Sequence, residues 1–176
     1  MYNMEEKLAA YWKDATTFDT QYYISRTNIS SVFETNSGIG LNDMRYRSNY
    51  GFIHTSANLF LCRKYLGASG MYGEKIPLIR LAEMYFIAME CGPLSEASRL
   101  YEEFCLSRDI ELVNLQSEAQ LEEVLIKEYN KEFYAEGQAF YAFKRLAVEN
   151  ILWAKFPGDE ESYVVPLPLS EINYGN

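Results

Sequence analysis

The spacing of apolar residues divides the chain near residue 75 into two parts. From residue 76 onward, apolar residues recur three to four positions apart, as in amphipathic helices. Before it, only residues 1–15 show this spacing, and Ser, Thr, Asn and Gly interrupt it over residues 16–50. We therefore expect one mainly α domain over residues 1–176. It has a loop-rich part at 1–75, with a short helix and long loops, and a helical part at 76–176.

Two helices joined by a short turn are predicted at the start of the helical part. The first is expected to begin at Pro77 and to end at Gly92-Pro93, and Ser95 is expected to cap the second. The expected inward-facing side chains are Leu78, Leu81, Ala82, Tyr85, Phe86 and Met89 on the first helix and Ala97, Leu100, Tyr101 and Phe104 on the second. The pattern indicates one degenerate tetratricopeptide-like helix pair and no array of repeats.

A further long helix is predicted to open at a capping box formed by Ser117 and Gln120. Its apolar face runs to Gly137, where the helix either stops or crosses a neighbour, and the next helix is expected to reach about Ala147 or Trp153. The irregular helical fold continues into a tail with two prolines, which we expect to be extended.

A small β-hairpin is predicted in the loop-rich part. Two short strand-like runs, at residues 52–54 and 59–62, are separated by a polar break. Residues 66–75 contain three glycines and indicate a flexible linker.

Charge and composition narrow the possible functions. The chain has 16 Lys and Arg against 25 Asp and Glu, a net charge of −9, which argues against a nucleic-acid partner. His54 is the single histidine, and the three cysteines form no C-x-x-C pair, so no metal site is expected. The sequence has no phosphate-binding loop and no G-x-S-x-G element. We expect no enzyme activity and no cofactor.

Three glutamates, Glu128, Glu132 and Glu136, recur every four residues and share one helical face. A paired-acid or di-metal site is the catalytic alternative, but a di-iron bundle needs Glu-x-x-His motifs that a single histidine cannot supply. Charges on such a face survive burial only when they are paired. The residues expected to form structural ion pairs are Arg80, Glu83, Glu128, Glu132, Glu136 and Arg145, with Lys131 as a further partner.

The loop-rich part is also aromatic, in a chain with 15 Tyr, 10 Phe and 2 Trp. Flat rings beside guanidinium and amide groups can grip sugars and peptides by stacking and hydrogen bonding. The candidate ligand-binding residues are Trp12, Tyr22, Tyr23, Arg45, Tyr46 and Tyr50. The equal alternative is that these rings form the core of a loop-rich layer.

Three segments carry a family resemblance. They are IPLIRLAEMY at residues 76–85, KEYNKEFYAEGQAFYAFKR at 127–145 and VVPLPLSEI at 164–172, with weaker matches at Asp43-x-Arg45 and Arg63-Lys64-Tyr65. In this order and spacing they resemble the signature of the SusD/RagB family, outer-membrane nutrient-binding lipoproteins of Bacteroidetes. The chain departs from the family pattern at Asn130 and Lys131, where arginines are commoner.

The resemblance implies a non-enzymatic, surface-exposed lipoprotein that captures a glycan or peptide ligand and hands it to a TonB-dependent, SusC-like outer-membrane transporter. It also implies that the buried charges are architectural, and it carries over no ligand-contact residue. Family members are several times longer and begin with a lipoprotein signal. This chain, which shows neither such a signal nor a membrane span, is therefore expected to be a soluble C-terminal portion. The alternative is a helical protein–protein interaction module without a small-molecule ligand.

Overall fold

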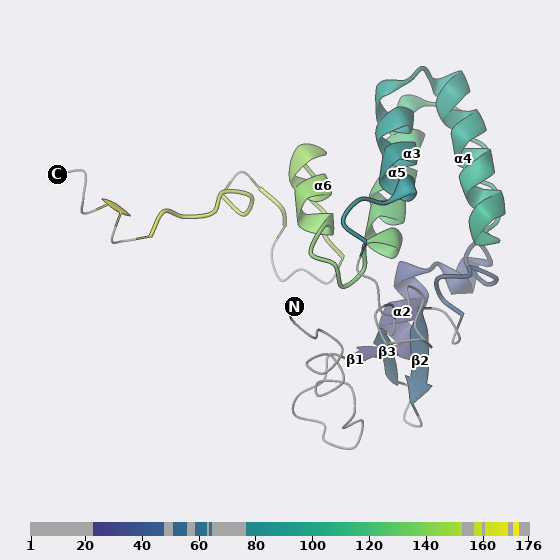
Figure 1. Ribbon diagram of the computed structural model, residues 1–176, viewed down its shortest axis with the longest axis horizontal. Helices are drawn as coiled ribbons and strands as arrows, with labels where there is room; N and C mark the ends of the chain where they lie inside the picture. The colour runs from purple at the N-terminus through teal and green to yellow at the C-terminus, as the bar shows by residue number, and fades with distance from the viewer. Residues whose placement is uncertain are drawn as a thin grey trace.

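The protein is mainly helical with a small antiparallel sheet, as predicted (Figure 1). The computed structural model describes residues 23–47, 51–55, 59–62, 64, 77–152, 157–159, 161–168 and 171–172. In these residues the elements are β1 (Tyr23–Ser25), α2 (Arg26–Val32), the 3-10 turn η1 (Thr35–Ser37), β2 (Phe52–Thr55), β3 (Leu59–Cys62), α3 (Leu81–Cys91), α4 (Leu94–Arg108), α5 (Glu118–Glu132) and α6 (Ala139–Arg145). Figure 1 shows α3, α4 and α5 gathered on one side of the sheet and α2, with α6 beside them and the tail projecting away.

The sheet has the order β1-β3-β2, with both pairs antiparallel. The predicted hairpin is present as β2 and β3, in a register that pairs Phe52 with Cys62. The expectation of irregular structure over residues 16–50 is wrong at two places, β1 and α2. Ser25 ends β1 and caps α2, because its Oγ accepts a hydrogen bond from the backbone N–H of Asn28 at 3.1 Å.

A small apolar core lies between the sheet and α2. Ile29 and Phe52 are fully buried there, and the rings of Phe33 and Phe52 meet edge to face with centroids 5.7 Å apart. Tyr134 reaches this core from the segment after α5, with its ring centroid 5.3 Å from that of Phe52. The loop-rich part and the helical part therefore share buried contacts.

Helices α3 and α4 form the predicted pair, but α3 begins one turn later than Pro77. Arg80 stands at its N-cap with extended backbone (φ −121°, ψ 141°). Leu78 and Leu81, expected to face inward, are exposed, whereas Phe86 is fully buried as expected. On α4 the expected inward side chains are buried or half-buried, but the N-cap is Pro93, not Ser95.

The main core is built from α3, α4 and α5 around the ring of Phe86. Its centroid lies 4.7 Å from that of Tyr129 and 5.1 Å from that of Phe104, both edge to face. Met89 and Leu125 close the cluster at 0% and 2% exposure. Such dense aromatic packing is sensitive to the loss of any one ring.

Ser117 caps α5 as the sequence predicts, with its Oγ accepting from the N–H of Gln120 at 3.2 Å. Replacing Ser117 by alanine is expected to lower the free energy of unfolding by about 1 kcal/mol, because one N–H of the first turn loses its acceptor. Urea unfolding followed by circular dichroism measures the change. Ser95→Ala is the matched control and is expected to be neutral within about 0.5 kcal/mol, since Ser95 is exposed and caps nothing. Equal losses in the two variants would contradict this account.

Helix α5 ends at Glu132, and a turn containing Gly137 (φ 73°) leads into α6. Gly137 therefore neither stops α5 nor lies at a helix crossing; it lies in the turn that follows the helix, where its positive φ suits glycine. Helix α6 ends at Arg145, close to the predicted end at about Ala147 and well short of Trp153. Beyond Tyr163 the tail is irregular and exposed through Pro168. Across the described part of the chain, no helix has the length and apolar content needed to cross a bilayer.

Candidate functional site

One face of α5 carries charges into the interior. Glu128 and Glu132 are each 2% exposed, and Lys131 between them is fully buried. Their spacing along α5 directs all three toward the segments that join the sheet to the helices. Burial of so many charges requires partners from other elements.

Arg45 is the centre of the resulting ion network. Its Nη2 donates to Asp43 Oδ2 and to Glu128 Oε2, both at 2.7 Å, and its Nη1 donates to Glu132 Oε2 at 3.1 Å. Arg45 Nε donates to Asp43 Oδ1 at 3.0 Å, so this pair is bidentate. Both side chains are almost completely buried.

The carboxylate of Glu132 forms ion pairs with three arginines from three separate segments of the chain. Besides Arg45, Arg80 Nη2 donates to its Oε1 at 2.5 Å and Arg108 Nη2 donates to the same oxygen at 3.0 Å. Arg80 and Arg108 also lie over aromatic rings, with Arg80 4.5 Å from the centroid of Phe133. The carboxylate of Glu132 thus ties α3 and α4 to the loop that holds Arg45.

The network continues past the end of α5 to Glu136. Its Oε1 accepts from Arg80 Nη1 at 2.7 Å and from Lys64 Nζ at 2.8 Å. Lys64, only 2% exposed, also donates to the backbone carbonyls of Glu132 and Tyr134 at 2.7 and 3.1 Å. The first of these bonds satisfies one of the carbonyls that the end of α5 leaves open, and the second satisfies one in the turn that follows.

In the other direction the network reaches the surface through Glu34. Lys131 Nζ donates to Glu128 Oε1 at 2.8 Å and to Glu34 Oε2 at 2.7 Å. The other oxygen of Glu34 accepts from the exposed Lys127 at 2.8 Å. Glu34 takes up the left-handed conformation (φ 52°), which places it between α2 and α5.

The pKa values of the buried glutamates suit ion pairs that stabilise the fold and do not suit acid–base catalysis. Burial disfavours the ionised form of Glu132, but the charge of Arg45, with Arg108 and Arg80, outweighs it and lowers the pKa of Glu132 to about 2. Burial likewise opposes ionisation of Glu128, and Arg45 with Lys131 still lowers its pKa. A general acid at neutral pH needs a raised pKa, so neither group suits that role.

Stability is expected to fall in acid because of Glu132. Its pKa in the folded state lies below its ordinary value of 4.5, so the ionised form adds stability that is complete above about pH 4.5 and is lost as the pH falls toward 2. A shift of this size corresponds to about 3 kcal/mol. Urea unfolding at a series of pH values measures it, and a stability that stays constant between pH 5 and pH 2.5 would contradict it.

Most residues predicted to form structural ion pairs meet in this network. Arg80, Glu128, Glu132, Glu136 and the further partner Lys131 lie within it, as described above. Two residues lie outside the network.

Arg145 bonds instead to Glu90 at 2.8 Å and to the hydroxyl of Tyr129 at 3.0 Å. Glu83 forms no ion pair with any residue that the structure describes, so its predicted role is wrong.

In the part of the chain that the structure describes, the predicted ligand-binding side chains do not meet at one site. Arg45 is 1% exposed and all three of its side-chain nitrogens donate to carboxylates, so the prediction that it contacts a ligand is wrong. Tyr46 is half-buried, with its ring centroid 5.7 Å from that of Phe33 and 6.1 Å from that of Phe60, as the loop-core alternative expects. The side chains of the other four predicted residues lie outside the part of the chain that the structure describes: Trp12, Tyr22, Tyr23 and Tyr50.

The predicted ion-pair set left out Arg45, which was assigned to a ligand, and also Glu34, Asp43, Lys64, Arg108 and Lys127. Asp43 and Lys64 belong to the weak upstream segments of the family resemblance, which was the one signal that could have found them. Glu34 and Arg108 have no such signal, because their roles depend on where η1 and the end of α4 lie in space.

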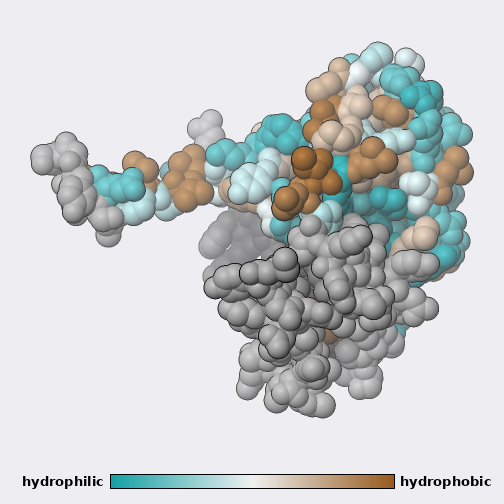
Figure 2. All heavy atoms as spheres, viewed as in Figure 1, coloured by the Kyte–Doolittle hydropathy of each residue, from teal (hydrophilic) through white to brown (hydrophobic). Residues whose placement is uncertain are grey.

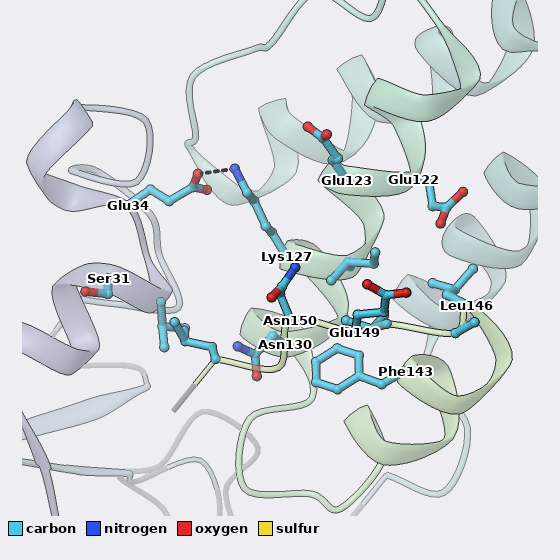
Figure 3. Close-up of a pocket in the computed structure, with 15 residues that line it drawn as sticks. Ser31, Glu34, Glu122, Glu123, Lys127, Asn130, Phe143, Leu146, Glu149 and Asn150 are labelled. Atoms are coloured by element: carbon cyan, nitrogen blue, oxygen red, sulfur yellow. Dashed lines mark hydrogen bonds and ion pairs between the residues drawn. The ribbon is translucent and has the colours of Figure 1, made fainter. Parts of the chain in front are cut away.

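A cleft of about 500 Å³ opens beside the network, between α2, α5 and the segment that follows α6 (Figure 3). Glu34 and Lys127 form one of its walls, and their ion pair is drawn in Figure 3. Its apolar lining is formed by Val32, Ile126, Phe143, Leu146, Ala147, Val148 and Leu152. Its volume is within the range of about 300–1,000 Å³ that is usual for small-ligand sites.

No group of three or more potential metal ligands is present among the described residues. Comparisons with protein-family models, curated proteins and solved structures gave no match. The candidate site therefore has two parts, the buried ion network and the cleft that shares Glu34 with it.

Proposed function

We propose that this protein is a non-enzymatic nutrient-binding protein of the SusD/RagB type, acting at the bacterial outer-membrane surface beside a TonB-dependent transporter. The supporting observation is that separate segments of the sequence resemblance meet in one buried ion network. Asp43 and Arg45, Lys64, Arg80 and the Glu128–Glu136 face all contribute to it.

The convergence supports the proposal because the resemblance alone connected Asp43, Arg45 and Lys64 with the helical segments that carry Arg80 and the glutamates. Arg45 and Glu128 are 83 positions apart, and Lys64 and Glu136 are 72 apart, yet both pairs are bonded. A buried charge with no partner costs several kcal/mol, so a network of this kind must be kept or lost as a unit. In a sequence, such a unit corresponds to a set of charged residues that lie far apart along the chain.

The cleft beside α5 is the proposed nutrient site. It combines an apolar lining with amides and carboxylates, the mixture that orients small polar ligands. The acids of the network are fully engaged by cations, which supports binding without turnover.

Two measurements test the proposal together. Titration of the chain with panels of oligosaccharides and short peptides, followed by calorimetry, is expected to give binding of at least one class with no product formed. A tagged chain added to detergent-solubilised outer membranes of its source organism is expected to retain a β-barrel transporter, identified by mass spectrometry. Absence of both a ligand and a transporter would overturn the proposal, and so would catalytic turnover abolished by Glu128→Gln.

A second candidate is a helical protein-interaction module. It is favoured by one observation, the apolar surface at the start of α3, where Leu78 is 92%, Ile79 78% and Leu81 73% exposed. Figure 2 shows hydrophobic residues gathered on the helical part and along the tail. Retention of a soluble protein that is lost on Leu78→Ser and Leu81→Ser, with no transporter and no small ligand, would favour this function over nutrient binding.

A further inference from the structure

We propose that the cleft between α2, α5 and the segment after α6 binds a short basic peptide, with apolar side chains on its floor and Lys or Arg side chains at its acidic rim. The inference deepens the proposed function, on which it rests, by selecting a peptide over a glycan. It follows from the charge, the lining and the walls of the cleft.

The rim of the cleft is strongly acidic. Among the described residues that line it, four carboxylates, from Glu34, Glu122, Glu123 and Glu149, stand against the one ammonium of Lys127, a net charge of 1 − 4 = −3. Lys127 is already bonded to Glu34. The other three carboxylates are exposed, and none of them forms an ion pair with a residue in the described part of the chain.

All three carboxylates belong to residues that line the cleft. Glu122 and Glu123 project from α5, while Glu149 comes from the segment after α6 on the facing side (Figure 3). Like charges held near one another are relieved by a cationic ligand, and an anionic ligand is repelled. The cleft therefore selects for positive charge.

The floor is apolar and carries an unused amide. Phe143 and Val148 are 8% and 7% exposed, and Ile126 beside them is half-buried. Asn130 lies half-buried in the lining, and its side chain has no hydrogen bond to any described residue. An amide of this kind can both donate to and accept from a peptide group.

The same lining argues against a glycan. Phe143 is the one aromatic residue among the described residues that line the cleft, and it is largely buried. A stacking platform for a sugar needs an exposed ring face. A basic peptide matches each of these features. Its aliphatic side chains suit the apolar floor, its backbone suits the amide of Asn130, and its cationic side chains suit the acidic rim.

The wall that carries Glu149 is held in place by the tail. The hydroxyl of Tyr163 donates to the carbonyl of Val148 at 2.5 Å, and the N–H of Gly158 donates to the carbonyl of Glu149 at 2.7 Å. Gly158 allows this approach, because a Cβ there would lie 2.2 Å from the Val148 oxygen. The opposite wall is fixed by the ion pairs of Glu34. Preformed walls reduce the ordering cost of binding.

The test is calorimetric titration of the whole chain with two blocked tripeptides, acetyl-Lys-Leu-Lys-amide and acetyl-Glu-Leu-Glu-amide. We expect the basic peptide to bind at least tenfold more tightly than the acidic one, and to weaken as the salt concentration rises. The double variant Glu122→Gln and Glu149→Gln is expected to reduce affinity for the basic peptide about five- to tenfold, because each exposed charge contributes modestly.

Glu102→Gln is the matched control, since Glu102 is an exposed glutamate on α4 that does not line the cleft, and it is expected to leave affinity unchanged. Equal affinity for the two peptides, no binding of the basic peptide at millimolar concentration, or indifference to the double variant overturns the inference. If a glycan binds with an affinity that the double variant does not alter, the inference fails and the proposed function stands. If the basic peptide binds as expected but no transporter is retained, the outer-membrane role fails and the specificity of the cleft stands.

Discussion

Replacing Glu132 by glutamine is expected to lower the free energy of unfolding by about 3–5 kcal/mol. The substitution preserves the shape of the side chain but leaves Arg45, Arg80 and Arg108 with one carboxylate fewer in a site that is 2% exposed. Since domains of this size are stable by only about 5–15 kcal/mol, this is a large part of the total.

Urea unfolding followed by circular dichroism measures the change. Glu102→Gln serves as the control, because its carboxylate is exposed and forms no ion pair with the described residues. It is expected to change stability by less than about 0.5 kcal/mol. A loss below about 1 kcal/mol for Glu132→Gln would contradict the view that the network is a structural unit. Where the variant does not fold, the acid dependence of the unaltered chain gives the independent measurement.

Replacing Phe86 by alanine is expected to cost about 3–5 kcal/mol. The ring is fully buried and contacts the rings of Phe104, Tyr129 and Phe133, so its loss removes a large apolar area and leaves a cavity where three elements meet. The neighbouring Ile87 is 43% exposed, and Ile87→Ala is expected to cost less than about 1 kcal/mol. The two variants differ by one position on the same helix. Similar losses would show that packing around Phe86 is not what holds α3 in place.

The sequence predicted the helices best where apolar spacing and packing agree. On α4, Ala97, Tyr101 and Phe104 are buried as the spacing indicates. On α3 the same reasoning placed the helix start at Pro77, one turn too early, because the extended backbone at Arg80 places its guanidinium over Glu132 and Glu136. This is a tertiary effect, and helix-start rules do not contain it.

In the loop-rich part the hairpin was predicted, but β1 and α2 could not be. β1 has three residues, too few for an alternating pattern, and is defined by its pairing with β3. α2 has seven residues and depends on the Ser25 cap and on burial of Ile29 against the sheet. Neither pairing nor docking can be read from local spacing.

The candidate site was partly predictable for a similar reason. A repeat of four places Glu128 and Glu132 on one face of α5, but it does not say which cations they meet. Arg45 was therefore assigned to a ligand, although it lies at the centre of the network. The cleft was not predicted, because its walls come from α2, α5 and the segment after α6. None of these segments alone carries a sequence pattern that indicates a binding site.

The ion pairs of Glu34 join residues far apart in the sequence, and this affects how the chain folds. Its carboxylate joins residues that are 93 and 97 positions away, and Arg45 closes loops of 83 and 87 positions. Helices α3, α4 and α5 can pair through local contacts, but the charged face of α5 stays uncompensated until the first part of the chain arrives. We therefore expect folding to be slow for a mainly helical protein, because its last step depends on distant contacts. For the same reason residues 76–176 are expected to be unstable when expressed alone, so the two parts behave as one cooperative unit.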